Sequence, residues 1–210
     1  MKILKSLILL VLILNGCSFG ERELIFGTAI NYFHKDFISH FPKTVPIEFS
    51  LNVISQNTTN SHPHVWLKYY KSENELDLLK DSIENVAVAK YQTSDSCLLV
   101  IDKHLNKSNW YKIDKSKRIP KKIDYNDKPC HHNKYPVPNF YSTDWSETNS
   151  NPTRLKGYDL YVLEAKPGIY MDSTKLPNGL YTPKDWKHGY SKGIAINDET
   201  SAIIFWADIW

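Results

Sequence analysis

The chain has 210 residues and carries 26 basic against 23 acidic side chains, a formal net charge of +3. This near balance argues against a nucleic-acid partner, because binding to phosphates needs a concentrated positive surface. The length is sufficient for one domain with a substantial apolar core.

The first seventeen residues have the pattern of a bacterial export signal. Lys2 and Lys5 precede an apolar stretch, residues 6–14, that is too short to cross a membrane. The segment Leu14-Asn15-Gly16-Cys17 resembles the lipobox of bacterial lipoproteins. This resemblance implies cleavage before Cys17, a diacylglyceryl group on its sulfur and a further acyl chain, such as palmitate, on the new amino terminus.

Residues 1–16 are then a signal peptide, and residues 17–210 form a single mature domain on a short tether. The mature chain keeps 24 basic and 23 acidic residues, close to neutral. Ser18 stands where lipoproteins retained at the inner membrane have Asp, so the resemblance favours the outer membrane. We expect the domain to face the periplasm, and we expect the lipid on Cys17 to hold it at the membrane.

The first predicted element of the mature chain is a helix that covers at least the latter part of residues 21–41. Its apolar positions recur at steps of three and four residues, which is typical of an amphipathic helix: Leu24, Ile25, Ala29, Tyr32, Phe33, Phe37 and Phe41. Pro42 and Pro46 end the pattern. A helix lying on the membrane is possible, and a helix facing the core of the domain is favoured.

Residues 47–55 and 65–70 alternate as half-buried strands and are candidates to pair with each other. A helix follows at Ser72, because Glu75 stands three residues on, at the spacing of a capping box. Two further strands are predicted at 86–91 and 97–101, separated by a turn at 93–95.

Residues 106–155 lack periodicity and are predicted to form a long irregular region. Cys97 and Cys130 are the two cysteines left after lipidation of Cys17, and an exported chain would meet oxidising conditions. We therefore expect a disulfide that closes a loop of 34 residues and pins this region, with two separate buried thiols as the alternative.

The C-terminal part returns to strands at 158–165, 193–197 and 202–209, with a short helical turn at 183–187 and a hairpin through 198–200. Together the elements predict an α+β fold on a mostly antiparallel sheet, with an N-terminal helix, one further helix and the irregular middle region. The segments WKHGYSKGIAI and IIFWADIW resemble those of uncharacterised lipoproteins from Bacteroides-type bacteria. That resemblance implies no activity and no site residue.

Catalytic and metal motifs are weak in this sequence. Gly189-Tyr190-Ser191-Lys192-Gly193 has the spacing of a nucleophile elbow but stands at the entrance to a predicted strand rather than before a helix. The His62/His64 pair and the Cys130-His131-His132 cluster each supply too few ligands for a structural zinc site. We therefore expect no metal, no cofactor and no catalytic residue, and an enzyme is the less favoured class.

Aromatic residues in the irregular region are the best candidates for a binding surface, because exposed rings stack on sugars or anchor a protein partner. They are Trp110, Tyr111, Tyr135, Phe140, Tyr141 and Trp145. Rings that cover the core are the favoured alternative. The predicted function is a binding domain for an envelope protein or glycan; the alternatives are an envelope hydrolase and an inhibitor or immunity-type lipoprotein.

Overall fold

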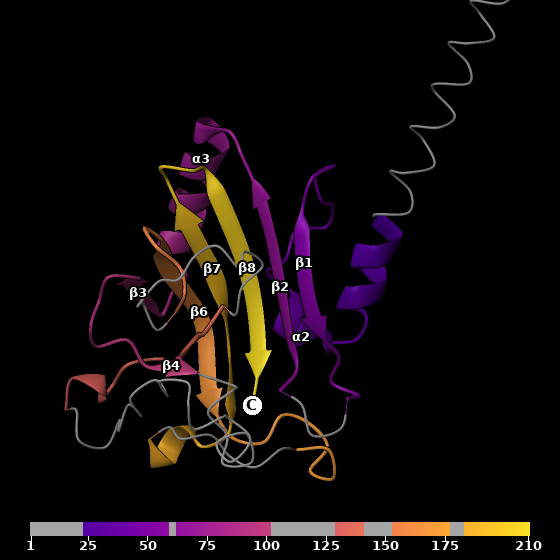
Figure 1. Cartoon of the computed structure of the whole chain (residues 1–210), viewed down its shortest axis with the longest axis vertical. Helices are drawn as coiled ribbons and strands as arrows, with labels where there is room; N and C mark the ends of the chain where they lie inside the picture. Colours follow the sequence, from indigo (N-terminus) through magenta and orange to yellow (C-terminus); the bar gives the residue numbers. More distant parts are fainter. Residues whose placement is uncertain (1–22, 59–61, 102–128, 141–152, 177–182) are drawn as a thin grey trace, which may run out of the picture.

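The computed structural model describes residues 23–58, 62–101, 129–140, 153–176 and 183–210. Its centre is a six-stranded antiparallel sheet with the strand order β1-β2-β8-β7-β6-β3 (Figure 1). The bounds of the strands are β1 Ser50–Ile54, β2 His64–Tyr70, β3 Ala89–Gln92, β6 Asp159–Pro167, β7 Gly189–Asn197 and β8 Ala202–Ile209. Export signal, lipobox and Cys17 lie outside the described residues.

The predicted strand pairings are confirmed at the centre and at one edge of the sheet. β7 and β8 form an antiparallel hairpin in which Asn197 stands opposite Ala202. β1 pairs with β2, as residues 47–55 and 65–70 were expected to do, and β2 pairs in turn with β8. Every residue of β8 is buried, because this strand lies between two neighbours and is covered on both faces.

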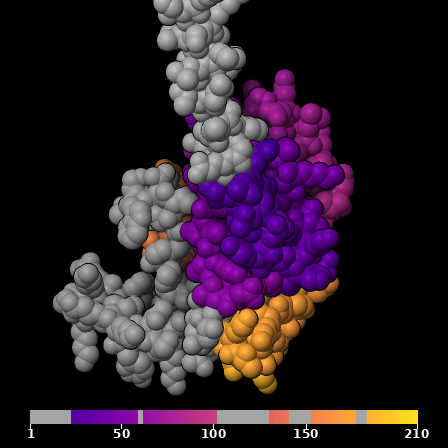
Figure 2. Space-filling view, turned by 90° about the vertical axis from the view of Figure 1, so that its right-hand side faces the viewer, coloured from indigo at the N-terminus to yellow at the C-terminus, as the bar shows by residue number. Residues whose placement is uncertain are grey.

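Helical segments cover one face of the sheet. Residues 23–30 are helical, α2 runs from Lys35 to Ile38, and α3 runs from Glu73 to Glu84. Their apolar side chains pack on those of the strands in one cluster, which includes Phe26, Phe33, Phe37, Leu76, Ile83, Ile194 and Phe205. Figure 2 shows the N-terminal segment in indigo as a broad outer surface of the molecule.

The other face of the sheet carries a second apolar cluster built from less regular chain. A short parallel pair, β4 (Val100–Ile101) and β5 (Val137–Pro138), packs here near the 3₁₀ turns η2 (Pro129–His131) and η3 (Lys184–Trp186). Members of this cluster include Leu98, Val137, Phe140, Leu160 and Trp206. The predicted strands at 86–91 and 97–101 thus belong to different sheets, since β3 pairs with β6.

Cys97 and Cys130 are at disulfide-bond distance, with their Cα atoms 5.6 Å apart. The predicted bridge is therefore present in the structure. It joins the segment that leads into β4 to the segment that leads into β5. It pins the described residues 129–140 of the predicted irregular region, most of whose remainder lies outside the described residues.

The N-terminal helix is interrupted, which differs from the continuous pattern predicted within 21–41. Helix 23–30 ends in a turn, where the N–H of Phe33 donates to the carbonyl of Ile30. His34 then caps α2, because its ring accepts the N–H of Asp36. The predicted spacing of buried apolar side chains continues across the break, since Phe26, Phe33, Phe37 and Phe41 are all buried.

The second predicted helix begins where its capping box indicates. The backbone N–H of Ser72 donates to Glu75 Oε2 over 3.2 Å, and the Ser72 hydroxyl donates to the same oxygen over 2.8 Å. The predicted class, helices packed on a mostly antiparallel sheet, is thus present in the described residues. Within these residues, no helix is both long enough and apolar enough to cross a membrane.

Candidate functional site

A cleft of about 850 Å³ opens where the N-terminal segment meets the ends of β1, β6 and β7. Figure 2 shows the chain around residue 170 in orange, directly against the indigo N-terminal segment. The polar and charged residues that line the cleft are His34, Asp36, Ser39, Gln56, Asn57, Glu164, Lys166, Asp172, Lys175 and Lys192. Its apolar lining residues are Phe37, Tyr170, Met171 and Tyr190.

A β-bulge in β6 decides which residues face this cleft. Val162 stands opposite Gly193 and Glu164 stands opposite Lys192, so Leu163 is the extra residue. Without the bulge, Glu164 would point to the same face as Val162, into the second apolar cluster. With it, the carboxylate points to the face covered by the N-terminal segment, where Lys192 also points.

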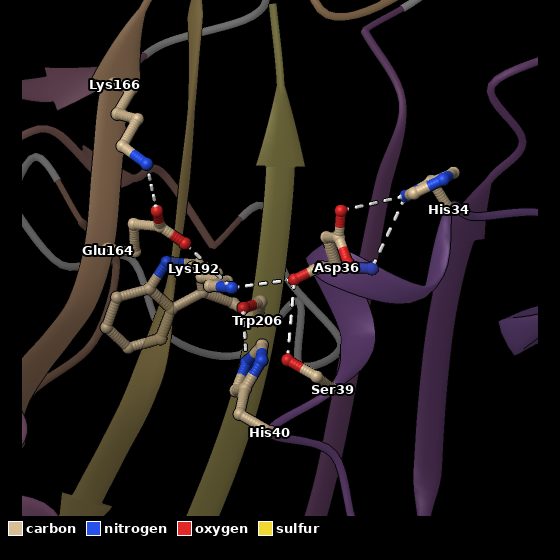
Figure 3. A network of polar contacts seen from close by, with 8 residues as sticks. All are labelled: His34, Asp36, Ser39, His40, Glu164, Lys166, Lys192 and Trp206. Carbon is tan, nitrogen blue, oxygen red and sulfur yellow. Dashed lines mark hydrogen bonds and ion pairs between the residues drawn. The ribbon is translucent and has the colours of Figure 1, made fainter.

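Glu164 is the centre of a charged network (Figure 3). Lys192 Nζ lies 2.8 Å from Glu164 Oε2, and Lys166 Nζ donates to Oε1. The nearby hydroxyl of Tyr190 also contributes to the lowered pKa of this carboxylate. Both oxygens of Glu164 are therefore engaged by donors from the two strands that form the floor of the cleft.

This arrangement fixes the protonation states on the cleft floor. Hydrogen bonds from Lys166 and Lys192 lower the pKa of Glu164 to about 2, so its carboxylate is ionised at physiological pH. Burial and the hydrogen bond to Glu164 raise the pKa of the Tyr190 hydroxyl well above its usual range. Tyr190 therefore stays a neutral donor.

Lys192 also ties the sheet to the N-terminal segment. Its ammonium donates to the backbone carbonyl of Asp36 over 2.6 Å, while its side chain is only 12% exposed. Close by, Nε2 of His40 donates to the carbonyl of Trp206 over 3.0 Å, and burial lowers the pKa of His40 to about 3. His40 is therefore neutral at physiological pH, and α2 is held over the sheet by one cation and one neutral ring.

Three aromatic rings form one wall of the cleft. Tyr170 and Tyr190 meet edge to face with ring centroids 4.6 Å apart, and Phe37 meets Tyr190 in the same manner at 5.0 Å. Phe37 and Tyr190 are buried, whereas Tyr170 is half-buried. Tyr170 therefore offers the accessible ring of this wall.

The cleft offers hydrogen-bonding groups and balanced charge. In the described part of the chain its lining has three lysines and three carboxylates. A carboxyl that donates a proton in catalysis needs a raised pKa. Glu164 has a lowered pKa, and so does Asp172, whose carboxylate accepts hydrogen bonds from the N–H and hydroxyl of Thr174.

The aromatic residues expected to form a binding surface are placed only in part. Trp110, Tyr111, Tyr141 and Trp145 lie outside the described residues. Phe140 is 5% exposed and packs against Trp66 and Trp206, so this ring belongs to the core, the alternative that was favoured for the group. Tyr135 is half-buried, and its N–H donates to the hydroxyl of Tyr91.

Ser191 of the elbow-like motif lies inside β7 and is 1% exposed; its hydroxyl donates to the carbonyl of Pro136 over 2.7 Å. His62 and His64 are also buried, and His64 Nε2 bonds the amide oxygen of Asn52 over 2.9 Å. Among the described residues, no group of three His, Cys, Asp or Glu side chains is placed to hold a metal ion.

The cleft residues were missed in the sequence because they come from four distant segments. One signal was present: Lys192 is the one charged residue in the nine of β7. A lone lysine in a buried strand needs a counter-charge. Finding Glu164 as that partner requires the register of β6 and its bulge. No family model, curated protein or solved structure matches the chain.

Proposed function

We propose that this chain is a lipid-anchored protein of the bacterial cell envelope whose mature domain binds a glycan in the Glu164 cleft without turning it over. The observation that carries the binding role is the Glu164 centre, in which two lysines are held in place by one ionised carboxylate. The anchoring role is carried by the lipobox at Leu14–Cys17 and the outer-membrane preference by Ser18.

A glycan suits this lining better than a flat protein surface does. Sugars present hydroxyls that both donate and accept hydrogen bonds, together with apolar faces that stack on aromatic rings. The cleft offers lysines, the amides of Gln56 and Asn57, and the half-buried ring of Tyr170. Ligand sites are concave in this way, with a few placed polar groups.

A hydrolase remains the second candidate because Asp36, Glu164 and Asp172 all line the same cleft. Glycoside hydrolysis requires one carboxyl to act as an acid and another as a base or nucleophile. The lowered pKa values of Glu164 and Asp172 do not suit the acid role, which requires a raised pKa. An inhibitor or immunity-type lipoprotein would instead engage a protein.

Oligosaccharides released from lipopolysaccharide by mild acid, and from peptidoglycan by a muramidase, are the probes that test this proposal. We expect calorimetry to detect binding of one set by the wild type, and Tyr170→Ala to weaken it roughly fivefold, because an aromatic contact contributes about 1 kcal/mol. Tyr70→Ala is the matched control: Tyr70 is 58% exposed and belongs to β2.

Equal affinities of the wild type and Tyr170→Ala would contradict the placement of the ligand in this cleft. Absence of binding to both sets would contradict the glycan assignment. Appearance of new reducing ends during the titration would identify the hydrolase instead.

A further inference from the structure

The helix at residues 23–30 has two apolar sides, and only one of them is used by the core. Phe26, Ala29 and Phe33 face the sheet and are buried. Leu24, Ile25 and Tyr32 face outward, with Leu24 69% exposed. Figure 1 shows this helix, in indigo, on the outer side of the molecule beyond β1.

The outward side also lacks the charges that a water-facing helix normally carries. Ten consecutive residues, Leu24 to Phe33, contain no Asp, Glu, Lys or Arg. Surface helices of soluble domains place charged residues opposite their buried stripe. After Glu23 in the first turn, the exposed residues here are all uncharged: Leu24, Ile25, Gly27, Thr28, Asn31 and Tyr32. Uncharged exposed residues that include aliphatic and aromatic side chains are found in helices that lie in a membrane interface.

The length of chain between this helix and the lipidation site limits what can meet it. Cys17 and Glu23 are six residues apart, so an extended chain spans at most about 20 Å between them. A lipid held at Cys17 therefore keeps the helix close to the head groups. The charges flanking this stretch are balanced, since Arg22 stands between Glu21 and Glu23, and Lys35 precedes Asp36.

We infer that the Leu24–Tyr32 side of this helix lies on the bilayer, as a second membrane contact beside the lipid on Cys17. This inference rests on the proposed lipid anchor. The contact fixes how the domain sits on the membrane, because the opposite side of the same helix is packed on the sheet. Lipid anchors become firm when a second membrane contact is added to a weak one.

Environment-sensitive labels on the full lipidated protein test this contact. Leu24→Cys carries a nitrobenzoxadiazole dye in vesicles of phosphatidylethanolamine and phosphatidylglycerol, with or without brominated acyl chains. Leu78→Cys is the matched control, because Leu78 on α3 is 70% exposed, against 69% for Leu24. We expect bromine to quench the dye at position 24 at least twofold more than at position 78.

Equal quenching at the two positions, with both proteins floating with the vesicles, would overturn the contact and leave the anchor intact. Shielding of the dye at position 24 from water that rises with protein concentration, without quenching by bromine, would show that a second copy of the chain covers this side of the helix. Failure of the Leu78→Cys protein to float with the vesicles would contradict the proposed lipid anchor and, with it, the second membrane contact.

Discussion

Glu164 shows how one side chain can set the properties of a whole cleft. Its carboxylate neutralises Lys192, which is 12% exposed and which also holds the carbonyl of Asp36. Removing one member of a partly buried ion pair costs more than the pair itself contributes, because the remaining charge loses its partner. The same contact therefore stabilises the sheet, positions α2 and shapes the floor of the cleft.

The Glu164→Gln substitution is expected to lower the free energy of unfolding at pH 7 by about 1 to 2 kcal/mol, allowing for a Glu164 side chain that is 31% exposed. The pKa of Glu164 is near 4.5 when unfolded and about 2 when folded. The contribution of the ionised Glu164 side chain to the free energy of unfolding is thus complete above pH 4.5 and disappears as the pH falls toward 2. Urea unfolding of both proteins between pH 7 and pH 2 measures whether their free energies of unfolding become equal at low pH.

Glu84→Gln is the control for that experiment. Glu84 pairs with Lys90 over 3.2 Å, with both side chains about half exposed, so its removal should change stability little at any pH. A stability difference between Glu164→Gln and the wild type that does not shrink below pH 4.5 would show that charge is not what Glu164 contributes.

At the level of the strands, β7 and β8 are fitted to each other at Gly193. A Cβ atom there would overlap the ring of Trp206 and the carbonyl oxygen of Tyr161. We expect Gly193→Ala to lower the free energy of unfolding by about 3 kcal/mol, since the sheet must shift to admit the methyl group. Midpoints of urea unfolding measure the change.

Gly27→Ala supplies the contrast, because Gly27 is in helix 23–30 and a Cβ atom there meets nothing within 4 Å. Alanine favours a helix over glycine by about 1 kcal/mol, so this variant should be more stable than the wild type. Similar midpoints for the two variants would show that the Trp206 contact does not constrain β7.

The helices and strands differ in how far the sequence predicts them. The strands around 65–70 and 202–209, the helix after Ser72 and the Cys97–Cys130 bridge were predictable, because each depends on local period, capping or cysteine count. The break before α2 and the bulge at Leu163 were not, because each depends on tertiary contacts. The cleft is formed by the break before α2 together with the bulge at Leu163, so it could not be found in the sequence.

Three features of the fold bear on how the domain is held together and where its cleft lies. The sheet carries an apolar cluster on each face, the Cys97–Cys130 bridge pins the less regular one, and the N-terminal segment helps to form the cleft. A lipid on Cys17 would hold this segment at the envelope membrane. In the proposed arrangement, the anchoring of the domain and its orientation on the membrane depend on what is attached to residue 17.

Intact-mass spectrometry of the protein extracted from bacterial membranes tests that dependence most directly. The account predicts a chain that begins at Cys17 and exceeds the mass of residues 17–210 by a diacylglyceryl group and an amide-linked acyl chain. A chain that retains residues 1–16, or one that begins at Cys17 with an unmodified thiol, would contradict it.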